Sequence, residues 1–233
     1  GTGLSSHELN QPGTYQDVTD TTVTAQFKAK KETLPDFLKK VEGDIYFLAW
    51  TTTPWTLPSN TALTVGPKIE YVTVKTFNQY TFEPITVVLA KGLVGKQFAG
   101  KYAQVETESE LVEFNEGDKK VPYWVGESFV GKDLVGIQYE QLLPYALPYQ
   151  NPENAFRVIS GDFVTTEDGT GIVHTAPTFG ADDALVAKQA KPEVPPMLVL
   201  DEKNNTVPLV DLQGRFRPEM KEFCGKYVKI LYY

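Results

Sequence analysis

The chain has 233 residues, 41% of them hydrophobic, and a formal net charge of -8 at pH 7. Its length and apolar content allow a sizeable core, whereas its negative charge argues against a protein that binds nucleic acid unaided, because Lys and Arg supply most of that affinity. One cysteine and two histidines provide neither a disulfide framework nor a four-ligand zinc site. We therefore expect metal-free chemistry in a reducing compartment, the cytoplasm. There is no run of roughly 18 apolar residues and no signal-peptide pattern, so no membrane association is expected.

The first part of the chain reads as a lead-in followed by a helix. Residues 1–17 are loop-like and are expected to lead in from a larger protein, and residues 18–233 are expected to form a single domain. The lysine-rich stretch FKAKKETLPDFLKK is most simply a solvated helix and its approach. The helix is expected over residues 34–44, with a proline early and Gly43 placed to stop it.

Most of the remaining chain has the composition of β-strands. Its segments are rich in β-branched and aromatic residues and are bounded by Gly, Pro, Asn or Asp. The expected strands, in chain order, are 44–50, 69–77, 85–90, 102–108, 133–139, 156–164, 169–176 and 226–233.

Three other segments complete the pattern. Residues from about 110 to 155 are punctuated by prolines and are expected to be a less regular inserted region. A second helix is expected over 181–191, where two acids and later lysines suit the helix dipole, and hairpins are expected between 191 and 216, with Asn204 and Asn205 at a turn. Many short strands with few helices predict a mainly β fold with some α (α+β), a β-barrel or curled sheet with peripheral helices and hairpins.

The segment EDGTGIVHTAPTFGADDA, residues 167–184, concentrates chemically useful side chains. Its glycines allow a turn into a short strand that carries His174, and a second turn leads to a helix that opens with Asp182 and Asp183. Taken alone, His174 is most simply a satisfied histidine at a strand end, and the acids interact with the helix dipole. Together, His174 and Asp183 could reach one cavity, where a carboxylate would hold a cationic amino group or orient a water molecule.

The second such segment is AWTTTPWTLPSN, residues 49–60. In an extended chain Thr51 and Thr53 project to one face and Thr52 to the other, until Pro54 turns the chain. Hydroxyl groups both donate and accept hydrogen bonds, which suits ribose hydroxyls or an ester carbonyl, but they are poor nucleophiles without a base. A strand whose threonines merely reflect β-propensity is the competing interpretation.

The two segments together closely resemble the editing domain of isoleucyl-tRNA synthetase, the insertion called connective polypeptide 1. The resemblance rests on TTTPWTLPSN, on GTGIVHTAP about 110 residues later, and on GADD, and it covers roughly residues 18–216. His174 favours the isoleucyl member, because the related valyl enzymes have lysine there. Neither signature of the synthetase catalytic core occurs, so the resemblance implies an editing domain without the synthetic site.

The resemblance implies a β-barrel that hydrolyses valine esterified to isoleucine tRNA, and valyl-adenylate. Thr52, Thr53 and Asp183 would be the catalytic residues, and Asp183 would also bind the substrate's ammonium group. His174 would border the amino-acid pocket and exclude isoleucine by size. The other residues implied to bind the adenosine and the ester are Thr51, Trp55, Thr56 and Asn60.

The implied mechanism is attack of water on the ester, with orientation and electrostatics supplying most of the acceleration. No cofactor and no metal is expected for editing, whereas the parent synthetase uses ATP and Mg. The implied partners are the 3′ end of isoleucine tRNA and the rest of the synthetase in cis, and the isolated domain is expected to be monomeric. The alternative is a module that binds the tRNA 3′ end or an aminoacyl-adenylate without hydrolysing it.

Overall fold

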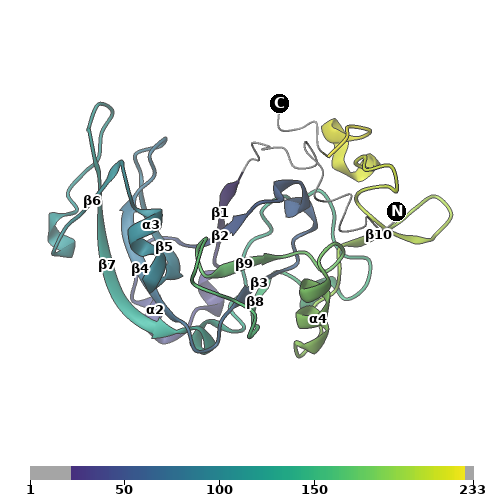
Figure 1. The fold of residues 1–233 in the computed structure, drawn as a ribbon, viewed down its shortest axis with the longest axis horizontal. Coiled ribbons are helices and arrows are strands. Elements are labelled where there is room, and N and C mark those ends of the chain that lie inside the picture. The colour runs from purple at the N-terminus through teal and green to yellow at the C-terminus, as the bar shows by residue number, and fades with distance from the viewer. Residues whose placement is uncertain (1–21, 229–233) are drawn as a thin grey trace, which may run out of the picture.

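A computed structural model describes residues 22–228 of the chain as one curled, mixed β-sheet with short helices around it (Figure 1). The sheet strands are β1 (Val23–Lys28), β2 (Ile45–Thr51), β3 (Ala62–Val65), β4 (Glu70–Phe77), β5 (Pro84–Ala90), β6 (Tyr102–Gln104), β7 (Val121–Val130), β8 (Arg157–Ser160) and β9 (Ile172–Thr175). A separate hairpin consists of β10 (Leu198–Leu200) and β11 (Thr206–Pro208).

The helices among the described residues are short. The α-helices are α2 (Asp36–Lys39), α3 (Val94–Gln97) and α4 (Ala181–Gln189). The 3-10 helices are η1 (Lys31–Thr33), η2 (Pro54–Ser59), η3 (Lys91–Leu93), η4 (Glu108–Glu110), η5 (Gly131–Leu134), η6 (Pro152–Asn154) and η7 (Pro218–Phe223). None of the helices between residues 22 and 228 is long and apolar enough to cross a membrane.

The strand order places β9 at the centre of the functional part of the sheet. The order is β6-β7-β4-β5-β2-β9-β3-β8, and β1 pairs with β2. Isolated bridges join Ala29 to Tyr139 and Gln138 to Arg157, so an irregular segment spans the gap between β1 and β8. The sheet therefore curls around a core, although the described residues do not form a closed barrel of regular strands.

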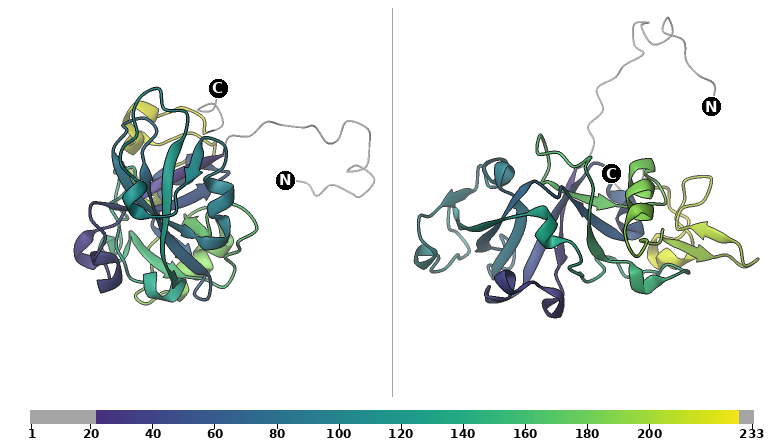
Figure 2. Two further views of the ribbon diagram at one scale, coloured as in Figure 1. Left: turned by 90° about the vertical axis from the view of Figure 1, so that its left-hand side faces the viewer. Right: turned by 90° about the horizontal axis from the view of Figure 1, so that it is seen from below.

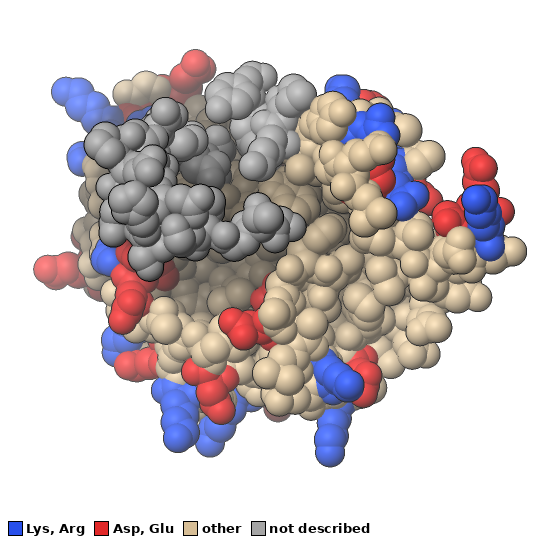
Figure 3. Space-filling view, turned by 45° about the vertical axis from the view of Figure 1, so that its right-hand side comes forward, with Lys and Arg blue, Asp and Glu red and all other residues tan. Residues whose placement is uncertain are grey.

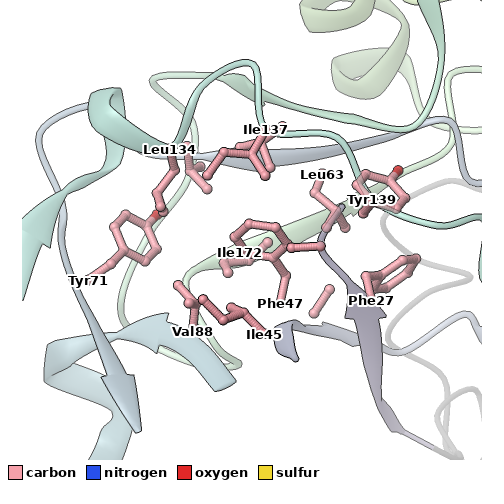
Figure 4. Close-up of a cluster of buried hydrophobic side chains, with 14 of the residues drawn as sticks. Phe27, Ile45, Phe47, Leu63, Tyr71, Val88, Leu134, Ile137, Tyr139 and Ile172 are labelled. Atoms are coloured by element: carbon pink, nitrogen blue, oxygen red, sulfur yellow. The ribbon is translucent and has the colours of Figure 1, made fainter. Parts of the chain in front are cut away.

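The principal core lies inside this curl (Figure 4). Phe27, Phe47 and Leu63, from β1, β2 and β3, are fully buried there. Tyr71 and Tyr139 are also fully buried and lie at opposite ends of the labelled cluster. Burial of an aromatic or large aliphatic side chain stabilises the fold by about 1.5–3 kcal/mol, so this cluster fixes how β2, β3 and β9 lie.

Two further groups attach the outer elements. α4 packs through Val186 and Ala187 against Ala62 of β3. A cluster around Met197 and Phe216 joins the β10–β11 hairpin to the C-terminal turns, and these elements gather at one end of the molecule, opposite β6 and β7 (Figure 2). Strand β9 therefore lies between β2 and β3 within the sheet, and α4 packs against its neighbour β3.

The fold class expected from the sequence, mainly β with some α, is confirmed. The expected strands at 44–50, 69–77, 85–90, 156–164 and 169–176 correspond to β2, β4, β5, β8 and β9, with shorter bounds for the last two. The helix at 181–191 is α4, and the hairpin turn contains Asn204 with a φ of 60°.

Other expectations were wrong in part. Residues 133–139 form the end of η5 and isolated bridges rather than a strand, and the expected helix at 34–44 is limited to the single turn α2. The region from about 110 to 155 contains β7, which pairs with β4 in the main sheet. Residues 1–17 and the end of the expected strand at 226–233 lie outside the described residues.

Candidate functional site

The threonine segment lies where β2 ends and turns into η2. Thr51 is the last residue of β2 and is buried, whereas Thr52 and Thr53 are exposed. The backbone N–H of Thr53 donates to Thr51 Oγ1 at 3.0 Å, and the two hydroxyl oxygens are 3.3 Å apart. Pro54 then begins η2, as expected for a proline at a first helical position. The turn thus holds two hydroxyls of alternate residues side by side.

Strand β9 brings the second segment to this turn. β2 pairs with β9 in parallel through Trp50 and Val173, and β3 pairs with β9 antiparallel, with Leu63 opposite His174. Because β2 leads into the threonine turn and β3 leads out of it, both ends of that turn are tied to β9. Thr56 and His174 are 118 residues apart on the chain, and the sheet makes them neighbours.

His174 joins the segments by direct hydrogen bonds. Its Nε2 lies 2.9 Å from Thr56 Oγ1, and its Nδ1 lies 2.8 Å from Asn60 Nδ2. The Thr56 hydroxyl also donates to the carbonyl of Thr53 at 2.8 Å. Three residues expected at the site, Thr56, Asn60 and His174, therefore form one buried network that reaches the exposed threonine turn.

Burial keeps His174 neutral. Its side chain is only 7% exposed, and loss of hydration lowers its pKa from 6.5 to about 4. Asn60 Nδ2 can only donate, so Nδ1 accepts and the ring proton is on Nε2. Since neither nitrogen has a free lone pair, His174 is not placed to remove a proton from water. The interpretation as a satisfied histidine at a strand end is confirmed for its hydrogen bonds.

Asp183 caps the end of β9 from the first turn of α4. Its Oδ2 accepts the backbone N–H of Ala176 at 2.9 Å, and the side chain is half-buried. Burial raises the pKa of Asp183, the Ala176 N–H opposes that rise, and the charge of Asp182 adds to it. Oδ2 is thus engaged, whereas Oδ1 accepts no hydrogen bond from the described residues and is available to a ligand. Asp183 reaches the threonine turn through β9 rather than by a hydrogen bond of its own among the described residues.

Trp55, which follows Pro54 in the turn, makes apolar and aromatic contacts. It is half-buried, meets the ring of Phe179 edge-on with centroids 4.9 Å apart, and packs against the C-terminal cluster. Together with Pro58, Phe216 and other apolar side chains it lines an apolar cavity of about 240 Å³. These contacts show Trp55 as a packing residue that holds the turn against the C-terminal cluster.

The turn that precedes β9 requires both of its glycines. Gly169 and Gly171 have φ values of +75° and +74°, in the left-handed region. A Cβ at Gly169 would lie 3.0 Å from the Trp50 ring, and one at Gly171 would lie 2.4 Å from Ala90 Cβ. The GTG sequence is therefore a packing requirement at the entry to β9.

One residue that the sequence did not single out belongs to the network. The hydroxyl of Tyr139, which is fully buried, donates to Asn60 Oδ1. Tyr139 lies in a segment without regular structure, and nothing in its local sequence indicates a polar role. Between residues 22 and 228, no group of three or more His, Cys, Asp or Glu side chains is placed to hold a metal ion.

The chain is similar to isoleucine–tRNA ligases throughout its length. It is 58% identical over 232 residues to the enzyme of Cytophaga hutchinsonii and 54% identical over 248 aligned residues to that of Bacteroides fragilis, with 100% of this chain covered in both cases. It spans about a fifth of those relatives, 20% and 21% of their lengths. No protein-family model matches the chain.

Solved structures with a similar fold are editing domains. The crystal structure of GlLeuRS-CP1 matches with a TM-score of 0.52 and 16% identity over 80% of this chain and 74% of that one. The editing domain of the P. knowlesi cytosolic leucyl-tRNA synthetase matches with a TM-score of 0.53 and 12% identity over 74% of this chain and 63% of that one. At these identities the likeness concerns the fold alone. The chain therefore belongs to the isoleucine–tRNA ligase family, in which it corresponds to a segment with the fold of a synthetase editing domain.

Proposed function

We propose that this chain is a hydrolytic proofreading domain that clears valine from isoleucine tRNA, and that valyl-adenylate is a second substrate. The observation that carries the proposal is the convergence of the threonine turn and the β9–α4 segment through His174. Hydroxyls, backbone groups and a carboxylate then border the same end of β9. This combination suits an ester, a ribose and an ammonium group.

The roles follow from the chemistry of each group. The exposed hydroxyls of Thr52 and Thr53 hold the ester and the attacking water, and Asp183 binds the ammonium group of the amino acid through its available oxygen. Thr51 supports Thr53, as its hydroxyl accepts the Thr53 N–H. Because His174 is neutral and saturated, it acts by shape and by fixing its neighbours, and no protein nucleophile takes part. Orientation of water and ester supplies the acceleration.

A hydrolytic site separate from the synthetic site is needed because a binding site discriminates poorly between amino acids that differ by one methylene. One methylene changes binding by only about 1–3 kcal/mol, a limit for which isoleucyl-tRNA synthetases are themselves the standard illustration. A pocket bounded by the buried His174 accepts valine and rejects isoleucine by size. Selectivity then comes from steric exclusion rather than from additional attraction.

The nucleic acid is delivered by the rest of the synthetase in cis. The net charge of -8 gives little attraction for phosphate, and on the face in Figure 3 the Lys and Arg side chains lie mostly along the outline of the molecule rather than in one patch. This domain is proposed to contact the 3′ end of the tRNA, without a cofactor or a metal of its own.

The test is deacylation of valyl-tRNA that carries the isoleucine anticodon, by wild-type chain and two variants. Asp183→Ala removes the proposed ammonium contact and should lower the rate at least about tenfold, the factor for one charged hydrogen bond. Asp182→Ala is the matched control, because it removes a neighbouring carboxylate that is exposed. Equal rates for Asp183→Ala and wild type would contradict the assignment of Asp183.

A second measurement distinguishes the hydrolytic domain from the alternative, a module that binds its ligand without hydrolysing it. A non-hydrolysable valyl-adenosine analogue should bind the wild-type chain under the same conditions in which valyl-tRNA is deacylated. Binding of the analogue without any turnover of valyl-tRNA, in the chain and in the whole synthetase, would favour the binding module.

A further inference from the structure

The hydrogen bonds around His174 run in one direction from a buried tyrosine to the threonine turn. Tyr139 donates to Asn60 Oδ1, and Asn60 Nδ2 donates both to the carbonyl of Ala62, at 2.9 Å, and to His174 Nδ1, at 2.8 Å. His174 Nε2–H then donates to Thr56 Oγ1, at 2.9 Å.

The donor-to-acceptor direction of this series of hydrogen bonds is fixed at both of its ends. The carbonyl of Ala62 can only accept, so it requires the amide nitrogen of Asn60 on its side. At the other end, the Thr56 hydroxyl donates to the carbonyl of Thr53, which leaves its oxygen to accept from His174. The Tyr139 hydroxyl stays protonated, because burial raises its pKa well above the usual range. Each donated hydrogen therefore has one acceptor, and a single tautomer of His174 satisfies the whole series of hydrogen bonds.

We propose that Tyr139 is a positioning residue of the hydrolytic site: together with the Ala62 carbonyl it holds the Asn60 amide in the orientation that sets the tautomer of His174, and it thereby fixes Thr56 at the threonine turn. The catalytic part of this statement rests on the proposed function. Tyr139 touches no substrate, since it is fully buried in the core beside Phe27 (Figure 4). Its effect is transmitted through Asn60 and His174.

The physical reason is the cost of a buried unpaired acceptor. Without the tyrosine hydroxyl, Asn60 Oδ1 has no donor and the Ala62 carbonyl alone holds the amide, so the cost of the unpaired oxygen favours a shift of the amide from its present orientation. Any such shift weakens the hydrogen bond to His174 Nδ1, and the ring is then free to exchange its proton between the two nitrogens. Thr56 then loses its fixed hydrogen bond from His174, and the turn that carries the exposed threonines is no longer held in one conformation.

The primary measurement is the tautomer of His174, read by long-range 1H–15N NMR spectra of the imidazole ring. The chain has two histidines, His7 and His174, and a His7→Gln variant assigns the two sets of signals. Wild-type chain should show only the Nε2–H form of His174. Tyr139→Phe keeps the aromatic ring and removes the hydroxyl, and it should produce a measurable Nδ1–H population.

Two further variants keep the result interpretable. Tyr71→Phe makes the same change at a second fully buried tyrosine, whose hydroxyl accepts the Gly66 N–H and donates to the Gly171 carbonyl, and it should leave the tautomer unchanged. Asn60→Asp presents an oxygen to His174 Nδ1 and should move the proton to that nitrogen, a result that does not depend on Tyr139→Phe folding well.

Deacylation tests the catalytic part separately. Tyr139→Phe should lower kcat for valyl-tRNA about tenfold, the factor for one hydrogen bond of ordinary strength, with little change in KM. An unaltered tautomer and unaltered kcat in Tyr139→Phe would overturn the inference, as would a wild-type tautomer in Asn60→Asp. A wild-type chain that shows the single tautomer but deacylates nothing, alone or within the synthetase, would overturn the proposed function and leave the role of Tyr139 in fixing the ring supported.

Discussion

His174 shows how burial decides the role of a single side chain. A histidine with an ordinary pKa would exchange protons near neutrality and could serve as a general base. Here burial lowers the pKa to about 4, and two side chains occupy the ring nitrogens. The residue is therefore a fixed part of the buried network, and in the proposed reaction the proton that leaves the attacking water goes to another acceptor.

The lowered pKa predicts a pH-dependent stability. A base with a depressed folded-state pKa contributes stability that is complete above its unfolded value of 6.5 and is lost as the pH falls toward about 4. Between about pH 7.5 and about pH 5 this group alone should remove about 2 kcal/mol from the free energy of unfolding. Urea denaturation at both pH values measures it, and His174→Gln should reduce the pH dependence by that amount. Identical pH profiles for the two proteins would contradict a buried neutral ring.

The contribution of Asp183 to stability depends on pH in the opposite direction. An acid with a raised folded-state pKa disfavours its charged form, so its contribution to stability falls as the pH rises through that pKa. Asp183→Asn keeps an oxygen for the Ala176 N–H and removes the charge, so at neutral pH it should be at least as stable as wild type while deacylation is lost. Chemical denaturation beside the deacylation assay checks this, with Asp182→Asn as the control. A large loss of stability in Asp183→Asn would assign the carboxylate a structural role.

At the scale of elements, β9 organises the site because it lies between β2 and β3. The sequence predicted β9, α4 and the threonine turn from local signals, namely glycines before a β-branched run, acids at a helix start and Pro54 after the threonines. It did not single out β1, β3 or β7. All four residues of β3 are buried, so the strand has no alternation of polar and apolar residues to reveal it. Tyr139 was missed because its partner Asn60 is 79 residues away in the chain.

The turn before β9 gives a prediction with a matched control. Gly171→Ala meets both a strained φ of +74° and Ala90, whose N–H is bonded to the Thr170 carbonyl, whereas Gly214→Ala has a φ of +79° and nothing within 4 Å of its added Cβ. Gly214→Ala should lower the free energy of unfolding by about 1 kcal/mol. Gly171→Ala should lower it by about 2 kcal/mol more, because the added Cβ overpacks the contact with Ala90. Thermal or urea unfolding compares the two. Equal losses of unfolding free energy in the two variants would show that Ala90 shifts without cost, and that the close contact at Gly171 does not hold β9 in place.

At the scale of the whole molecule, the core inside the curled sheet and the C-terminal cluster both hold the strands and the turn that form the candidate site. The core inside the curl fixes β2, β3 and β9, and the C-terminal cluster holds the threonine turn from outside through Trp55. The mainly β class followed from the sequence, because strand composition is local. The way the curl is completed did not follow from the sequence, since the segment around Tyr139 has the composition of a strand but joins β1 to β8 only through isolated bridges.

The central claim of the proposal is that the site around the threonine turn and Asp183 hydrolyses the smaller amino-acid ester and excludes the larger one. The direct test is the ratio of kcat/KM for valyl-tRNA and isoleucyl-tRNA on the same isoleucine tRNA, measured with the chain and with a synthetase that contains it. The account predicts a ratio of at least about a hundred in favour of valine, because exclusion by size adds to the small difference that one methylene provides. Equal rates for the two esters, or faster removal of isoleucine, would contradict it.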